Sequence, residues 1–328
     1  MSQNTVLEIK DLEVELYSEK GPLPVIDKVN LSIKEGEIVG IVGESGCGKS
    51  MLASAIMNLL NSPAQIAAGT IFYEGQDMTT LSSKEFQKIR GNEISMIFQE
   101  PMTSLNPLMK VGKQIEEAIK AHEKVTNAEL KERAIAAIRD VGIPQPEKVY
   151  HDIPSRLSGG MRQRIMIAMA LVCHPKLLIC DEPTTALDVT IQAQILRLIK
   201  KLRDETNTAV IFISHDMGVI YQMVDRVVVM YAGQFVECAP CKKLFEKPLH
   251  PYTIGLQNAI PQINKQQSSL QDIPGSVPML DNLPEGCLFA PRCPFAKSEC
   301  FTKKVPLKHY DDHDVRCLLV DEGGWHNE

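Results

Sequence analysis

The chain has 328 residues, of which 44% are hydrophobic, and a formal net charge of −6 at pH 7. That length and apolar content are sufficient for one large domain or two modest domains with a buried core. The acidic balance excludes a strongly basic nucleic-acid-binding surface over the whole chain, although it does not exclude local basic patches.

The sequence contains neither a membrane-spanning segment nor a secretory signal that we can recognise. The longest uninterrupted apolar run, Ile165–Cys173, is far shorter than the roughly 20 residues that a helix needs to cross a bilayer. The N-terminus carries Glu8, Asp11 and Glu13 and lacks the apolar region of a signal peptide. We therefore expect a soluble, cytoplasmic protein, for which a partner would supply any membrane-spanning helices.

A glycine-rich segment lies among short β-rich runs in the first part of the chain. The clearest predicted strands there are Val6–Ile9, Leu31–Ile33 and Ile71–Tyr73. The segment Gly43-Glu44-Ser45-Gly46-Cys47-Gly48-Lys49-Ser50 matches the phosphate-loop pattern G-x-x-x-x-G-K-[ST]. Its context agrees, because the apolar run Ile38–Val42 predicts a strand before it and Met51–Met57 predicts a helix after it.

The phosphate-loop pattern predicts a nucleotide site with specific roles for its residues. Glycines let backbone N–H groups surround the phosphates, and the helix N-terminus adds about half a positive charge. Lys49 is expected to reach the β- and γ-phosphates, and the Ser50 hydroxyl to contact Mg²⁺. We also expect Cys47, next to this helix N-terminus, to favour the thiolate form.

The middle of the chain is predicted to be mostly helical. Gln99 follows the apolar run Ser95–Phe98 and precedes a loop, where its side-chain oxygen can touch Mg²⁺ or water. Residues from about 100 to 175 follow, and apolar residues recur there at helical spacing. The clearest repeat is Leu130, Ala134, Ile138 and Val141.

A second glycine-rich segment, Leu157-Ser158-Gly159-Gly160-Met161-Arg162-Gln163, opens the apolar stretch Ile165–Cys173. Ser158 is a predicted helix N-cap. Because Gly159 and Gly160 leave backbone N–H groups uncovered, this helix start is a second predicted anion site.

Two carboxylates end the apolar run Leu177–Cys180, which predicts a buried strand. Asp181, at the strand end, is expected to hold Mg²⁺ through its water shell. Glu182 is the candidate general base that polarises the attacking water. Farther along, His215 follows the run Ile211–Ile213, and strands and helices alternate as far as Val227–Met230, which favours a parallel α/β core.

Together and in this order, these segments closely resemble the ATP-binding-cassette (ABC) family. The resemblance implies an α/β fold with a phosphate-loop NTPase core, an inserted helical subdomain at about residues 100–175, ATP hydrolysis, and ATP and Mg²⁺ as ligands. It also implies that Ser158–Gly160 of one subunit closes over the ATP that a second subunit's phosphate loop holds. The implied Mg²⁺ ligands are Ser50, Gln99 and Asp181.

The same resemblance assigns further roles. Gln99 matches the family's glutamine switch, and the His215 imidazole would bind the γ-phosphate and help to hold Glu182. Asp188 matches the aspartate loop that couples the two sites across the dimer. Tyr17, upstream of the phosphate loop, would stack on the adenine.

The end of the chain identifies a branch of this family. A polar linker, Gln262–Ser269, separates a predicted ATPase domain (1–262) from a Pro- and Cys-rich tail (263–328). The branch resembled is that of the oligopeptide/dipeptide ABC importers. The segments that carry the resemblance are His250-Pro251-Tyr252-Thr253, Pro274-Gly275, Leu283-Pro284-Glu285-Gly286-Cys287 and Pro291-Arg292-Cys293-Pro294.

Four of the nine cysteines, Cys287, Cys293, Cys300 and Cys317, lie in the last 42 residues, where an even distribution would place about one. Three interpretations are open for these cysteines. They are incidental thiols, they form disulfides, which the cytosol disfavours, or they bind a metal. The spacing lacks the C-x-x-C pairs of zinc ribbons, whereas four thiolates suit an iron–sulfur cluster. The resemblance implies a [4Fe–4S] cluster. The pair Cys238 and Cys241 does form a C-x-x-C, but it lacks a thioredoxin-like context, and we interpret it as structural.

The predicted function is that of an importer ATPase at the cytoplasmic face of the membrane. The resemblance implies two transmembrane permeases, a homologous or identical second ATPase, and a substrate-binding protein as partners, with no nucleic acid. The alternative is a soluble ABC ATPase that acts on nucleic acid or ribosomes. It is disfavoured because the chain has one phosphate loop and no long coiled coil. The cargo stays open between dipeptides, oligopeptides and nickel or other metal chelates.

Overall fold

The computed structural model of the chain describes residues 4–19, 21–99, 104–184, 188–259, 273–310 and 312–320. The chain divides into two compact units. Unit 1 comprises Met1–Leu7, Ile33–Glu37 and Tyr73–Ile211, and unit 2 comprises Glu8–Ser32, Ile38–Phe72 and Phe212–Glu328.

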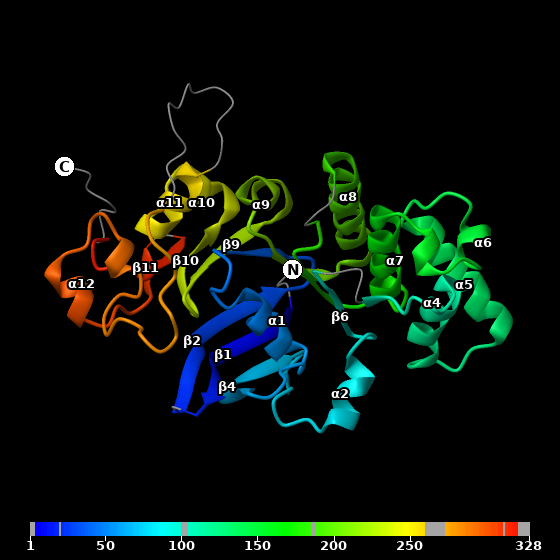
Figure 1. Cartoon of the computed structure of the whole chain (residues 1–328), viewed down its shortest axis with the longest axis horizontal. Helices are drawn as coiled ribbons and strands as arrows, with labels where there is room; N and C mark the ends of the chain where they lie inside the picture. Colours follow the sequence, from blue (N-terminus) through cyan, green and yellow to red (C-terminus); the bar gives the residue numbers. More distant parts are fainter. Residues whose placement is uncertain are drawn as a thin grey trace. The chain divides into compact units, whose positions relative to one another are not determined.

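Five strands of unit 2 follow one another in a sheet, in the order β11-β12-β10-β9-β3. Figure 1 labels β11, β10 and β9. Their bounds are β3 Ile38–Val42, β9 Arg226–Tyr231, β10 Gln234–Pro240, β11 Lys308–Tyr310 and β12 His313–Val315. Strands β3 and β9 are parallel, whereas β10 is antiparallel to both β9 and β12. All five residues of β3 are buried, so the strand that leads into the phosphate loop lies in the core, as its apolar run predicted.

A second sheet contains β2, β1 and β4 in that order. These strands, β1 Thr5–Ser18, β2 Gly21–Lys34 and β4 Ala64–Tyr73, are much longer than the strands predicted there. The reason is visible in β1, where exposed polar residues separate the buried apolar ones. Such alternation is typical of a sheet with one solvated face, whereas our prediction recognised only uninterrupted apolar runs.

Short helices connect the strands of unit 2. They are α1 Lys49–Ile56, α9 Met217–Met223, α10 Cys241–Glu246, α11 Pro251–Asn258 and α12 Ser298–Thr302, with a 3₁₀ turn at Ala290–Arg292. Helix α1 begins directly after the phosphate loop, which confirms the predicted strand, loop and helix context.

Unit 1 contains the strands that precede the other predicted site residues. Strands β6 Ile94–Ile97 and β7 Leu177–Asp181 are parallel neighbours. The next strand in the order is β8, Ala209–Ile213, of which residues 209–211 belong to unit 1 and residues 212–213 to unit 2. All residues of these three strands are buried, which is expected for parallel strands that are covered on both faces.

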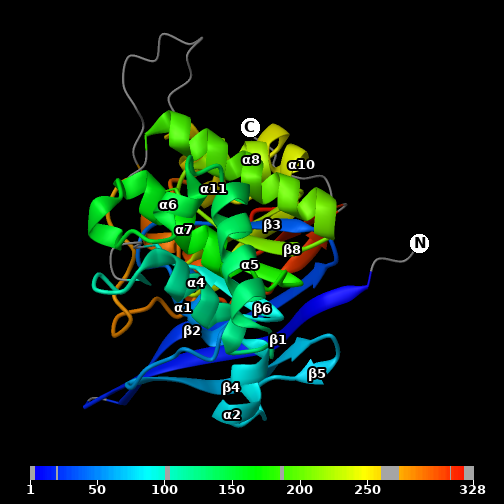
Figure 2. The same ribbon diagram turned by 90° about the vertical axis from the view of Figure 1, so that its right-hand side faces the viewer.

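Four α-helices among the described residues lie between β6 and β7 along the chain, and Figure 2 shows them side by side. They are α4 Val111–Lys120, α5 Asn127–Asp140, α6 Pro146–Val149 and α7 Gly159–Leu171. Helix α5 buries Leu130, Ala134 and Ile138, so the predicted helical repeat is confirmed. Unit 1 also contains α2 Ser83–Ile89 and α8 Val189–Thr206.

Within the described parts of the chain, none of the helices combines the length and the apolar character needed to cross a membrane. The predicted boundary between the ATPase domain and the tail, at residues 262 and 263, lies outside the described residues.

Candidate nucleotide site and cysteine cavity

The phosphate loop of unit 2 turns sharply between β3 and α1, and two glycines make that turn possible. A Cβ atom on Gly43 would lie 2.2 Å from the Met230 carbonyl oxygen, so no side chain fits there. Gly48 has φ +109 and would place a Cβ atom 3.0 Å from Ile26, and this left-handed conformation favours glycine.

Lys49 anchors the loop internally. The residue is 5% exposed, and its ammonium group donates to the carbonyl oxygens of Gly43, at 2.8 Å, and Glu44, at 2.9 Å. Ser45, Gly46 and Ser50 are exposed on the open side of the loop. No side chain caps the first turn of α1, so its backbone N–H groups are available for the anion that the motif predicts.

Cys47 differs from our expectation of a stabilised thiolate. Its side chain is only 1% exposed, and burial raises the pKa of the thiol. Lys49, whose Nζ atom lies 3.8 Å from the Cys47 sulfur, lowers that pKa but by less than burial raises it. The prediction was wrong because it weighed the helix N-terminus and omitted the cost of a charge without solvent.

Tyr17 and His215 are the other predicted nucleotide-contacting residues in unit 2. Tyr17 lies on β1 with 48% of its surface exposed, so one ring face is available for stacking. His215 follows β8 and is also exposed. The next residue, Asp216, caps α9 by accepting hydrogen bonds from Gly218 and Val219. This capped turn sets the direction in which the chain leaves β8.

In unit 1, strand pairing brings Gln99 and Glu182 together. Ile97 of β6 pairs with Cys180 of β7, so the residues two positions beyond each emerge at the same edge of the sheet. The Gln99 amide nitrogen donates to the Glu182 carboxylate at 2.9 Å. Asp181 is only 5% exposed, whereas Glu182 is partly exposed and adopts a left-handed φ of 46. The left-handed backbone turns Glu182 away from the strand that buries Asp181.

The Ser-Gly-Gly segment begins α7, and the Ser158 side chain accepts a hydrogen bond from the Met161 N–H at 3.3 Å. This confirms the predicted N-cap. A Cβ atom on Gly159 would meet nothing within 4 Å, and one on Gly160 would lie 3.3 Å from Ile191. None of the described residues of unit 1 therefore requires glycine at position 159.

Asp188, the predicted aspartate-loop residue, caps α8 by accepting a hydrogen bond from the Ile191 N–H at 3.0 Å. Residues 185–187, between Glu182 and this cap, lie outside the described ranges.

Gln163 belongs to the Ser-Gly-Gly segment, but the sequence alone predicts no role for it. It is 2% exposed, and its amide donates to the Pro183 carbonyl oxygen at 2.7 Å. The residue after Glu182 is therefore tied to α7. The signal in the sequence is a polar glutamine just before the apolar stretch Ile165–Cys173 of a predicted helix.

The four tail cysteines of unit 2 line one small cavity, together with His250 and Phe289. Its volume of about 10 Å³ is close to that of one water-sized sphere. Burial raises the pKa of Cys287, Cys293 and Cys317, so a bound cation would be needed to hold these groups as thiolates. All four are free thiols.

This donor set fits an iron–sulfur cluster in number and type. As they stand, however, no three His, Cys, Asp or Glu side chains in the described residues are arranged to hold a metal ion. The cavity is also too small for four iron atoms. A cluster would therefore require the thiols to move apart, and the cluster stays a proposal.

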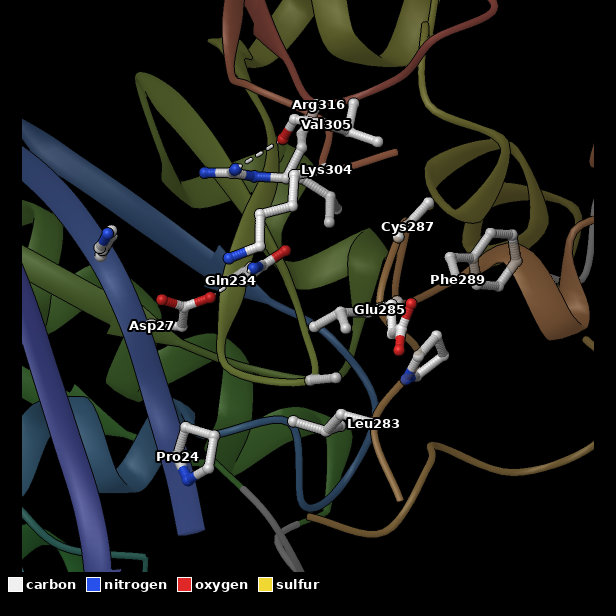
Figure 3. A pocket seen from close by; sticks show the side chains of 16 residues that line it. Pro24, Asp27, Gln234, Leu283, Glu285, Cys287, Phe289, Lys304, Val305 and Arg316 are labelled. Carbon is white, nitrogen blue, oxygen red and sulfur yellow. Dashed lines mark hydrogen bonds between the residues drawn. The ribbon is translucent and has the colours of Figure 1, made fainter. Parts of the chain in front are cut away.

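A larger pocket of about 320 Å³ lies beside this cavity in unit 2, and Cys287 lines both (Figure 3). Arg316 borders it and donates to the carbonyl oxygens of Val305, at 2.8 Å, and Phe235, at 3.1 Å. These bonds hold the tail segment against β10. The other pair, Cys238 and Cys241, lies at the end of β10 and the start of α10, away from this cavity.

Comparisons with known proteins agree with this geometry. The profile described as "ABC transporter" matches residues 26–185, and the profile "Oligopeptide/dipeptide transporter, C-terminal region" matches residues 236–300. The chain is 50% identical to the oligopeptide transport ATP-binding protein AppD of Bacillus subtilis, over 98% of both chains. It is 44% identical to the dipeptide transport ATP-binding protein DppD of Haemophilus influenzae, over 95% of this chain and 94% of the other.

The solved structure of the ATP-binding cassette MJ0796, a dimer in a post-hydrolysis state bound to ADP and Pi, superposes with a TM-score of 0.65 at 28% identity. It covers 72% of this chain and 98% of its own, so the chain has the ABC ATPase cassette fold. With that fold and full-length identity of this extent, the chain belongs to the family of ATP-binding subunits of oligopeptide and dipeptide ABC transporters.

Proposed function

We propose that this chain is the ATP-hydrolysing subunit of a peptide importer. The observation that carries the proposal is that one chain joins an ABC cassette to the oligopeptide/dipeptide C-terminal region. Relatives that align with 95–98% of this chain are named as transport ATP-binding proteins for oligopeptides and dipeptides. The chain would couple ATP binding and hydrolysis to the import of such peptides.

The hydrolytic roles follow from the position of each side chain. In unit 2, Lys49 would exchange its two loop carbonyl partners for β- and γ-phosphate oxygens. In unit 1, Glu182 would polarise the attacking water, and Gln99, already hydrogen-bonded to it, would orient its carboxylate. His215 would hydrogen-bond the γ-phosphate, and Tyr17 would stack on the adenine.

Mg²⁺ would bind oxygen ligands from Ser50, Gln99 and Asp181, which are hydroxyl, amide and carboxylate groups of the types that this ion prefers. When bound, the ion neutralises the charge that develops on the phosphates. The buried position of Asp181 suits a carboxylate that is matched to a cation rather than to solvent.

Two copies of the cassette would complete each site. The open surface around Gly159 supports a role for Ser158–Gly160 in contacting nucleotide that is held by another subunit, because no described residue of unit 1 occupies that space. Asp188, at the start of α8, would couple the two sites. The second copy would be either a homologous ATPase or an identical chain.

Helices α4 to α7 would form the helical subdomain of the cassette, and the tail from residue 263 a separate Cys-rich part. We place the chain at the cytoplasmic face of the membrane as a peripheral subunit, where two permeases would supply the spanning helices and a binding protein the cargo. In the tail, Cys287, Cys293, Cys300 and Cys317 would hold a [4Fe–4S] cluster. Its contribution would be structural, because metal–thiolate bonds would replace a hydrophobic core.

The test is reconstitution in liposomes with the permeases and binding protein encoded by the neighbouring genes. Peptides should stimulate ATP hydrolysis and accumulate in the vesicles, and Glu182→Gln should abolish both effects. Stimulation by nickel chelates but not by peptides would assign a different cargo to the same ATPase. No stimulation by either, with ATP hydrolysis intact, would contradict an importer.

A further inference from the structure

A residue of the tail contacts the phosphate loop directly. The guanidinium of Arg292 makes two hydrogen bonds with the Glu44 carboxylate, from Nη1 at 2.6 Å and from Nη2 at 2.9 Å. Both residues belong to unit 2, and they are 248 positions apart in the sequence. Glu44 is the second residue of the phosphate loop, so this ion pair joins the loop to the tail.

The ion pair lies in a specific, mostly buried environment. Arg292 has only 5% of its side chain exposed. Its remaining donors bond the carbonyl oxygens of Pro274, at 2.8 Å, and Ile273, at 3.2 Å. The guanidinium also lies 5.8 Å from the centre of the Tyr231 ring. A guanidinium with these partners has a single orientation, and bidentate pairing of this kind is geometrically specific.

The loop backbone is held at the same point. The Glu44 N–H donates to the Tyr252 hydroxyl at 2.8 Å, and the Tyr252 ring packs against Tyr231 at 4.7 Å. The side chain and the backbone of Glu44 are therefore both fixed by residues that lie after β9. Most surface ion pairs contribute little, but here the Arg292 side chain is buried, the Glu44 side chain is only 30% exposed, and the loop has a second anchor.

Loss of one partner has a predictable electrostatic consequence. Without Arg292, the Glu44 carboxylate would lose its cationic partner beside the loop that is proposed to bind the β- and γ-phosphates. Removing one member of a buried pair leaves the other uncompensated, and here the remaining charge has the same sign as the ligand. Removing both charges would relieve the repulsion.

We propose that Arg292 is a positioning residue for nucleotide binding, which acts through Glu44 to hold the phosphate loop and to neutralise its carboxylate. The inference rests on the proposed ATP site in the phosphate loop, and it adds that the tail is part of that site's support. The 3₁₀ turn that carries Arg292 lies between Cys287 and Cys293. A change in the packing of the cysteine cavity would therefore reach the phosphate loop through Arg292.

The experiment compares five forms of the full chain with wild type: Arg292→Ala, Arg292→Lys, Glu44→Gln, the double variant Glu44→Gln/Arg292→Ala, and Arg316→Ala. Arg316 is the matched control, because it is a tail arginine that bonds backbone carbonyls and not the phosphate loop. Dissociation constants for ATP are measured by calorimetry without Mg²⁺, kcat and KM with Mg²⁺, and folding by thermal unfolding.

Arg292→Ala should weaken ATP binding about tenfold or more and raise KM correspondingly, with a smaller change in kcat. Arg292→Lys should recover part of the affinity. The double variant should bind ATP more tightly than Arg292→Ala, because the uncompensated carboxylate is gone. Arg316→Ala should lower thermal stability without this selective loss of affinity.

Two results would overturn the inference. One is equal ATP affinity for Arg292→Ala and Arg316→Ala after both are shown to be folded. The other is a double variant whose loss of ATP affinity equals the product of the losses in Arg292→Ala and Glu44→Gln, because the two residues would then act independently. A wild-type chain that neither binds nor hydrolyses ATP would instead contradict the proposed function, so the two failures are distinguishable.

Discussion

The phosphate loop of unit 2 is held by residues far along the chain, whereas the Glu182 loop of unit 1 is held by nearer ones. Glu44 contacts residues 208 and 248 positions later. Glu182 contacts Gln99, 83 positions earlier, and Pro183 contacts Gln163, 20 positions earlier. The part that we propose to hold phosphate therefore depends on the C-terminal region, while the part that we propose to perform hydrolysis depends on α7 and β6. Variants of the two parts should separate into binding defects and rate defects.

The largest expected effect tests the hydrolytic half. Glu182→Gln should slow ATP hydrolysis on the order of 10²–10⁴-fold, because general-base catalysis contributes that range. ATP affinity should be retained, since the phosphate loop is unchanged. Single-turnover hydrolysis and equilibrium binding measure the two quantities separately. Exposed Glu205→Gln, on α8, serves as the control, and wild-type turnover by Glu182→Gln would remove Glu182 as the base.

How well the sequence predicts a contact depends on how far apart the two residues lie along the chain. Motifs within a few residues of one another, such as the strand, loop and helix around Lys49 and the Ser158 cap, were predicted correctly because local patterns determine them. The cassette fold followed from the order of the motifs. The Arg292–Glu44 pair could not be predicted, because nothing in the spacing of two residues 248 positions apart indicates a contact.

Burial explains why the prediction for Cys47 was wrong. The Cys47 thiol was assigned a lowered pKa from its neighbours in the sequence, but its side chain is buried by packing that the local sequence does not show. The desolvation that results is a tertiary property. The number of cysteines in the tail predicted that the four would lie together, and they line one cavity. Their geometry as metal ligands could not be predicted from that number.

A second way to sharpen the comparison is to remove the anchor of the Glu182 loop. Gln163→Leu should lower kcat by roughly tenfold and the free energy of unfolding by about 1–3 kcal/mol, because the buried Pro183 carbonyl loses its donor. ATP affinity should change little. The effects are read from steady-state kinetics and chemical denaturation.

Gln114→Leu is the matched control for that variant. Gln114 is also buried, and its amide donates to the carbonyl oxygens of Asn106 and Met109. The control should lose stability and keep kcat. If both variants lower kcat equally, Gln163 has only a structural role.

A third variant tests whether the tail supports the phosphate loop. Cys300→Ser should weaken ATP binding several-fold, because it places a hydroxyl in the buried cavity that Cys300 shares with Cys287 and Cys293, the two residues that flank the Arg292 turn. From the sequence alone we would expect ATP binding to persist when the tail is loosened, and the Arg292 contact changes that expectation. Calorimetric ATP binding and limited proteolysis of the tail measure both effects.

The same variant tests the proposed cluster. Wild-type chain purified without oxygen should be brown, with iron and sulfide near four each per chain, and Cys300→Ser should lose both. Cys238→Ser, which alters a thiol outside the cavity, should keep the colour and the affinity. A colourless, iron-free wild type whose tail still resists protease would leave the four cysteines as ordinary thiols.

The smallest expected effect concerns the chemistry of the loop itself. Because burial raises the pKa of Cys47, its thiolate fraction at neutral pH should be lower than that of an ordinary cysteine, and the thiolate is the reactive form. Alkylation at Cys47, followed by peptide mass spectrometry, should therefore be slow at pH 7. Below the pKa, it should rise by about tenfold per pH unit. Mg-ATP should slow it further, since bound phosphate holds the loop closed around the sulfur. Cys47→Ser should stay active and resist the reagent, whereas alkylation at pH 7 faster than that of a free cysteine would show that the helix N-terminus outweighs burial.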